Sequence, residues 1–180
     1  ESTGQWDDAG AMADGRASHT ATLLPDGRVF IMGGGSADDV YASTEFRLPD
    51  TGVWVSGPPM ETARAAHTAT TLDDGRILVV GGLNDIGGVF KSAEIFDSLL
   101  DTWTTASPKE GGSAFHTAVK LPDGRVLVMG GIGQSGLPSR VAEIYDPETD
   151  TWTPAAFTKD DHPGTTAVLM PDGRVLIAGG

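Results

Sequence analysis

The sequence contains no cysteine among its 180 residues. Disulfide bonds, thiolate nucleophiles and cysteine-ligated zinc sites are therefore excluded. Long hydrophobic runs are also missing, since none approaches the about 18 apolar residues of a membrane span. Positive charge is scarce, because 12 Lys and Arg residues face 25 Asp and Glu residues, giving a net charge of −13. Nucleic acid and an anionic membrane surface are therefore not expected as partners, since both would be repelled.

Helical patterning is also lacking. No stretch of ten or more residues keeps apolar side chains at the i, i+3, i+4 and i+7 positions, and the short apolar runs are rich in Val, Ile and Leu. Glycine, by contrast, is plentiful: the chain has 25, about twice the number that average usage of about 7% would give. Many tight turns between short strands are therefore expected, which predicts an all-β fold.

A repeat of about 49 residues runs through the whole chain. An Asp-Gly-Arg turn occurs four times, beginning at Asp26, Asp74, Asp123 and Asp172. A glycine pair follows each turn at the same distance: Gly33 and Gly34, Gly81 and Gly82, Gly130 and Gly131, Gly179 and Gly180. All four tryptophans keep the same phase, each 20 residues before its Asp: Trp6, Trp54, Trp103 and Trp152. A period near 50 residues indicates a repeat architecture.

Each repeat reads as four strands. A strand beginning at His19 leads into Asp-Gly-Arg, which suits a two-residue hairpin with positive φ angles, and an apolar strand follows. A variable loop then precedes a third strand, such as 141–145, and a turn at 146–150 leads to a fourth strand at 151–154. Four antiparallel strands per repeat predict one blade of a β-propeller.

A hairpin ending in Gly-Gly, followed by Glu-Ile-Tyr-Asp and Asp-Thr-Trp at fixed spacing, resembles the kelch motif. The resemblance covers essentially the whole chain and implies a kelch β-propeller with four-stranded antiparallel blades. Two positions depart from the pattern: Arg47 replaces the aromatic residue found at Phe96 and Tyr145, and Thr165 replaces the repeated histidine. The galactose-oxidase type of propeller is a more distant resemblance, and its cysteine–tyrosine copper site is excluded because cysteine is absent.

The repeat divides the chain into about 3.7 blades: the outer strand of one blade (1–15), three complete blades (16–63, 64–112 and 113–161) and two strands of a further blade (162–180). Clean closure into a four-bladed ring is not expected, because the last blade would lack its third strand. We expect a segment of a longer propeller of roughly six to eight blades, or a ring that a second copy completes. Exposed blade faces and strand edges would favour such self-association.

Residues that recur in every blade serve the scaffold, whereas a functional residue is needed only once. The repeated histidines, His19, His67 and His116, are therefore interpreted as structural, as are the tryptophans and glycine pairs. The repeated Glu45, Glu94 and Glu143 are expected to be buried and paired, since an unpaired buried charge is costly. The arginines of the Asp-Gly-Arg turns are expected to bond or pack between blades.

Binding specificity is expected in the variable loops between the second and third strands, which share one face of the propeller. Two further positions, Arg16 and Arg64, lie three residues before the repeated histidines, where later blades carry Ser113 and His162. Side chains of differing chemistry at equivalent positions of the repeat are typical of a binding site at the mouth of the central channel. The predicted contacts are Arg16, Arg64, Asp38, Asp39, Asn84, Asp85, Arg140 and His162. The acidic loops have no recognised metal-binding spacing, so no metal or other cofactor is predicted.

The favoured function is a non-catalytic scaffold that recognises a protein or a glycan through this loop face. One alternative is a carbohydrate-active propeller enzyme, such as a lyase, an epimerase or an oxidase, with catalytic residues partly outside this segment. Another is a structural kelch protein that assembles with itself. The high glycine and low lysine content resembles that of secreted or cell-surface bacterial kelch proteins, and this resemblance implies such a location without fixing the compartment.

Overall fold

The computed structural model describes residues 4, 8–156, 158, 160 and 163–179, which contain fourteen β-strands and no helix. The strands are β1 (Thr20–Leu23), β2 (Val29–Met32), β3 (Thr44–Arg47), β4 (Trp54–Gly57), β5 (Thr68–Thr71), β6 (Ile77–Val80), β7 (Ala93–Asp97), β8 (Thr102–Ala106), β9 (Thr117–Lys120), β10 (Val126–Met129), β11 (Ala142–Asp146), β12 (Thr151–Pro154), β13 (Thr166–Leu169) and β14 (Val175–Ala178).

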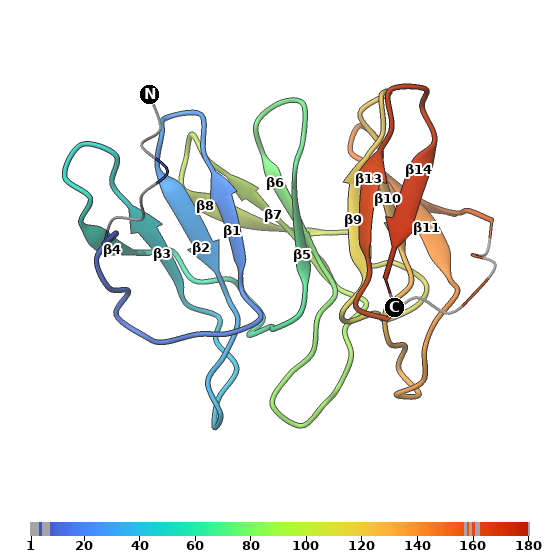
Figure 1. The fold of residues 1–180 in the computed structure, drawn as a ribbon, viewed down its shortest axis with the longest axis horizontal. Helices are drawn as coiled ribbons and strands as arrows, with labels where there is room; N and C mark the ends of the chain where they lie inside the picture. The colour runs from blue at the N-terminus through green and yellow to red at the C-terminus, as the bar shows by residue number, and fades with distance from the viewer. Residues whose placement is uncertain (1–3, 5–7, 157, 159, 161–162, 180) are drawn as a thin grey trace.

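These strands form three four-stranded antiparallel sheets and one two-stranded sheet (Figure 1). Blade 1 consists of β1–β4, blade 2 of β5–β8 and blade 3 of β9–β12, each as a simple meander, while β13 and β14 form a half-blade. The innermost strands β1, β5, β9 and β13 lie next to one another in series. The predicted blade topology is therefore confirmed, with three blades and a partial one.

The Asp-Gly-Arg hairpin differs from the prediction of a two-residue turn. In blade 1 the Leu24 amide donates to the Arg28 carbonyl at 2.8 Å, and the Gly27 amide donates to the Leu24 carbonyl at 3.0 Å. Only Gly27 takes a positive φ, of 86°, whereas Asp26 does not. The loop is thus three residues long, a tight turn closed by a left-handed glycine. The carboxylate of Asp26 accepts the Arg28 amide at 3.0 Å, which explains the Asp at this position.

The hydrophobic core lies between the blades. Along β6 the side chains alternate, so Ile77 and Val79 pack toward blade 1 while Leu78 and Val80 pack toward blade 3. The core between blades 1 and 2 contains Leu24, Phe30, Met32, Phe46, Met60, Ile77, Val79 and Phe96. The core between blades 2 and 3 contains Leu72, Leu78, Val80, Ala93, Ile95, Ala106, Val126, Val128 and Tyr145. A strand such as β6 is apolar on both faces because each face packs against a different neighbouring blade.

The glycine pairs allow neighbouring blades to approach closely at the inner strands. Gly81 has a φ of +64°, and a Cβ at this position would lie 2.3 Å from the carbonyl oxygen of Ser113 in the next blade. The amide of the next residue, Gly82, donates to that same carbonyl at 2.8 Å. A side chain at Gly81 would therefore be strained and would disrupt this contact between blades.

The repeated tryptophans and histidines bond each blade to the one before it. The indole N–H of Trp103 donates to Pro58 O at 2.9 Å, and that of Trp152 donates to Ser107 O at 2.7 Å. On the inner strands, His67 Nε2 bonds Thr20 Oγ1 at 2.8 Å. His116 Nε2 bonds Thr68 Oγ1 at 2.9 Å in the same way. These four residues thus make contacts between blades, as a structural role requires, while Trp6 lies outside the described residues.

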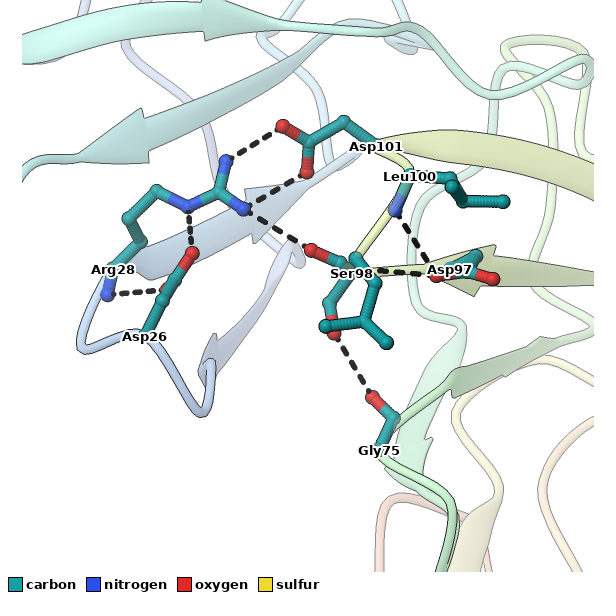
Figure 2. A network of polar contacts seen from close by, with 8 residues as sticks. Asp26, Arg28, Gly75, Asp97, Ser98, Leu100 and Asp101 are labelled. Carbon is teal, nitrogen blue, oxygen red and sulfur yellow. Dashed lines mark hydrogen bonds and ion pairs between the residues drawn. The ribbon is translucent and has the colours of Figure 1, made fainter.

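One turn arginine also joins two blades (Figure 2). Arg28 donates to both carboxylate oxygens of Asp101 at 2.9 Å, and its guanidinium lies 4.3 Å from the centre of the Phe46 ring. The hydrogen bond that Arg28 donates to Asp101 is the main cause of the raised pKa of Arg28. Arg76 makes only the bond to the aspartate of its own turn, Asp74, at 2.7 Å. The expected bonding between blades by a turn arginine is thus confirmed for Arg28.

Candidate functional site

Three hairpin extensions, which we call fingers, project on the same side of the molecule, opposite the Asp-Gly-Arg turns (Figure 1). Finger 1 spans residues 35–40, finger 2 spans 83–89 and finger 3 spans 132–138, each closed at its base by an isolated β-bridge. A second bridge ties each base to the chain just before the inner strand, at Ala17, Ala65 and Ala114. The variable loops are therefore short and anchored, although their sequences differ.

The fingers are internally bonded. In finger 1 the Ser36 amide donates to Asp39 O at 2.9 Å. In finger 2 the Asn84 side-chain oxygen accepts the Gly88 amide at 2.6 Å. In finger 3 the Gly133 amide donates to Leu137 O at 2.9 Å. Two large apolar residues of the fingers are exposed: Ile86 in the turn of finger 2, at 86% exposure, and Leu137 of finger 3, next to its base bridge, at 65%.

Four of the residues predicted to contact a partner lie together. Asp38 and Asp39 of finger 1 and Asn84 and Asp85 of finger 2 line one cleft between the two fingers. Arg140 lies elsewhere, beyond the base of finger 3, where its carbonyl accepts the Thr158 amide at 3.2 Å. His162 lies outside the described residues. In the part of the chain that the structure describes, no group of three or more His, Asp or Glu side chains is placed to hold a metal ion.

Arg16 and Arg64 lie beneath the finger face, and both side chains have 0% exposure. Arg64 donates to the Glu94 carboxylate at 2.7 Å, to Gly81 O at 2.6 Å and to Ser92 O at 3.2 Å. Burial lowers the pKa of Arg64, against the opposing effect of Glu94. The structure therefore corrects the prediction that these arginines contact a ligand, because a guanidinium with no exposed surface offers no contact. They are structural partners of the repeated glutamates.

The buried glutamate of blade 3 takes its cation from a different position. Ser113 occupies the arginine site there, and Lys109 reaches Glu143 Oε2 at 2.9 Å from the preceding loop. Glu143 also accepts the Glu110 amide at 2.7 Å, as Glu94 accepts the Glu61 amide at 2.7 Å. Burial lowers the pKa of Lys109, and its hydrogen bond to Glu143 opposes that shift. The expectation that the repeated glutamates are buried and paired is thus confirmed.

The residues just before the inner strands form what we call the inner rim: Ser18, Ala66, Phe115 and Gly164. All four have positive φ angles, between 54° and 67°. Each rim amide donates to the rim carbonyl of the preceding blade, from Ala66 to Ser18 at 2.9 Å, from Phe115 to Ala66 at 3.0 Å and from Gly164 to Phe115 at 2.9 Å. Successive blades are therefore joined by one backbone bond at each step of the rim.

Sequence reasoning missed three exposed apolar residues on this side of the molecule: Ile86, Leu137 and Phe115, the last with 42% exposure. The available signal was that each is a large apolar residue at a position where the other blades carry small or polar residues. A charged residue type does not by itself distinguish an exposed contact from a buried ion pair, as Arg16 and Arg64 show.

Comparison with known proteins agrees with this architecture. A sequence model described as the kelch motif matches residues 64–110 and 116–156, which include all the strands of blades 2 and 3. No curated protein matches the sequence. A solved structure titled "Structure of YjhT" superposes with a TM-score of 0.76 at 20% identity, covering 87% of this chain and 57% of that one. This chain therefore spans little more than half of the length of that protein.

The kelch-type architecture follows from three agreeing observations. The repeat phase, the four-stranded meander of each blade and the two motif matches all point to the same architecture. Among the described residues, no helix has the length and apolarity needed to cross a bilayer. The chain therefore carries kelch motifs over residues 64–110 and 116–156, and its described residues fold as three blades and a partial blade of a kelch-type β-propeller.

Proposed function

We propose that the chain is a binding module that recognises a partner protein through the finger face. The observation that carries the proposal is the exposure of Ile86 and Leu137 on anchored, internally bonded fingers. Large apolar side chains held in water lower the free energy of association when a partner covers them. Anchoring limits the conformational entropy that the fingers lose on binding.

The cleft between fingers 1 and 2 supports the same proposal. It is lined by three acidic residues, Asp38, Asp39 and Asp85, together with Asn84 and the apolar residues Val40 and Leu83. Polar groups next to exposed apolar anchors are the usual composition of a protein-binding surface. Kelch propellers are commonly used for binding, and the fingers are where the blades of this chain differ.

The test is a selection of ligands followed by comparison of matched variants. The chain is presented to a displayed peptide library and to a glycan array, and the affinity of the selected ligands is measured by biolayer interferometry. The test variant carries Ile86→Ser with Leu137→Ser. The control carries Leu99→Ser with Leu100→Ser in the β7–β8 turn on the opposite side, where the leucines are 87% and 71% exposed.

The finger variant is expected to bind selected peptides about tenfold or more weakly, because two anchors at the centre of an interface carry much of its energy. The control variant should bind as the wild-type chain does. Both should unfold at the same temperature as the wild type, because the replaced side chains are exposed. Equal weakening in both variants, or selection of glycans alone, would contradict the proposal.

A further inference from the structure

Phe115 is a large aromatic residue in a position that other blades fill with small residues. The equivalent inner-rim residues are Ser18, Ala66 and Gly164. The residue is 42% exposed, so its ring does not serve mainly to fill a core. A scaffold role recurs in each blade, whereas this ring occurs once. The rim therefore presents one aromatic surface among positions with little or no side chain.

The backbone of Phe115 is fixed on both sides. Its amide donates to Ala66 O at 3.0 Å, and its carbonyl accepts the Gly164 amide at 2.9 Å. The residue before it, Ala114, bridges to Ile132 at the base of finger 3. The Cα–Cβ direction of Phe115 is therefore set by two neighbouring blades and one finger.

Phe115 also lies close to finger 2 through its rim partner. Ala65, which precedes Ala66, bridges to Leu83 at the base of that finger. Leu83 in turn lines the cleft between fingers 1 and 2. The aromatic residue therefore belongs to the same side of the molecule as the finger face, next to the bases of fingers 2 and 3.

The charge of the surroundings indicates which ligand an aromatic surface would take here. The chain carries a net charge of −13, and the fingers carry three exposed carboxylates, on Asp38, Asp39 and Asp85. An aromatic face attracts a cation through its quadrupole, and a negative surface raises the local concentration of cations. A neutral or anionic ligand would gain nothing from either effect.

We propose that Phe115 is a cation–π contact for an arginine or lysine side chain in a basic segment of the partner protein. This inference rests on the proposed function and adds to it the chemistry of the partner. The segment would cross the inner rim with one basic side chain over the Phe115 ring. Its other basic side chains would lie toward the acidic cleft between fingers 1 and 2.

The test uses a fluorescein-labelled penta-arginine peptide at 150 mM salt, with a penta-citrulline peptide as the neutral control of the same shape. Binding to the full chain is followed by fluorescence anisotropy for the wild type, Phe115→Ala, Phe115→Leu and Phe115→Trp. Alanine is the residue that blade 2 carries at this rim position, so the Ala variant keeps a side chain that the rim accommodates. Thermal unfolding of each variant reports whether the fold is kept.

Penta-arginine should bind the Ala and Leu variants about two- to fivefold more weakly than the wild type, and the Trp variant at least as tightly as the wild type. Penta-citrulline should show no such order. Equal affinity for the wild type and the Leu variant would overturn the proposal, since leucine keeps the apolar bulk without the ring. Absence of penta-arginine binding to the wild type would overturn it as well.

The two proposals fail in different ways. If the finger variant loses its selected peptides while Phe115→Ala keeps both those peptides and penta-arginine, the binding module stands and the cation–π contact fails. If Phe115→Ala instead loses only ligands from the glycan array, a neutral sugar occupies the rim and the basic segment is refuted.

Discussion

Mild acid should destabilise this chain through two buried histidines of the inner strands. His67 and His116 are 5% and 6% exposed, and each is bonded through Nε2 to a threonine of the preceding blade. Burial is the main cause that lowers the pKa of each to about 3. The positive charges of Arg64 and Lys109 act in the same direction on His67 and His116, respectively.

The size of the effect follows from linkage between protonation and folding. An unfolded histidine titrates near 6.5, so below that pH the unfolded chain binds protons that the folded chain does not. The contribution of the two neutral histidines to the free energy of unfolding is fully present above pH of about 6.5. It is lost steadily as the pH is lowered toward about 3. Between pH of about 7 and about 5 the free energy of unfolding should fall by about 2 kcal/mol for each histidine.

The assay is urea unfolding followed by tryptophan fluorescence, at a series of pH values, for the wild type and for His116→Gln. Glutamine keeps a side-chain donor near Thr68 but does not titrate. The advantage of the wild type over this variant should shrink by about 2 kcal/mol between pH of about 7 and about 5. Carboxylates titrate in both chains, so their contribution cancels in the difference. Parallel pH profiles for the two chains would refute the argument.

Three further substitutions test the contacts between blades, each by urea unfolding at pH of about 7.5. Trp152→Phe removes the indole bond to the preceding blade and should cost about 1 kcal/mol; no loss would mean that water replaces the donor. Arg28→Ala should cost about 1 kcal/mol, and less at high salt, whereas Arg76→Ala should change stability by about 0.5 kcal/mol or less. Equal losses would contradict the difference in their contacts. Glu94→Ala leaves Arg64 buried without its carboxylate and should cost about 3–5 kcal/mol; a loss near 1 kcal/mol would show that the pair is dispensable.

The blades were predictable because their signals are local and repeated. The two-faced apolar strand Ile77–Val80 must lie between two layers, and the phase of Trp54, Trp103 and Trp152 marks the same strand in each blade. The turn was predicted less well, because the dipeptide Asp-Gly fits both a two-residue hairpin and a longer one. The choice depends on where the flanking strands pair, which the dipeptide does not specify.

The site was predicted only in part. Finger residues such as Asp38 and Asp85 were identified because loops that vary on a constant frame stand out in a repeat. Arg16 and Arg64 were misplaced, because a charged residue near a loop reads as exposed unless its partner is known. That partner is a glutamate about 30 residues away, and their contact forms only when a blade is folded.

The sequence by itself determined the repeat, the all-β class, the blade topology and the anionic character of this protein. These properties follow from residue spacing and composition, which need no long-range contacts to be read. Tertiary structure decided which charges are buried, which cation pairs with Glu143, and that Phe115 stands exposed on a rim of small residues. Exposure depends on which side chains of neighbouring blades cover a residue, and the spacing of residues along the chain does not contain that information.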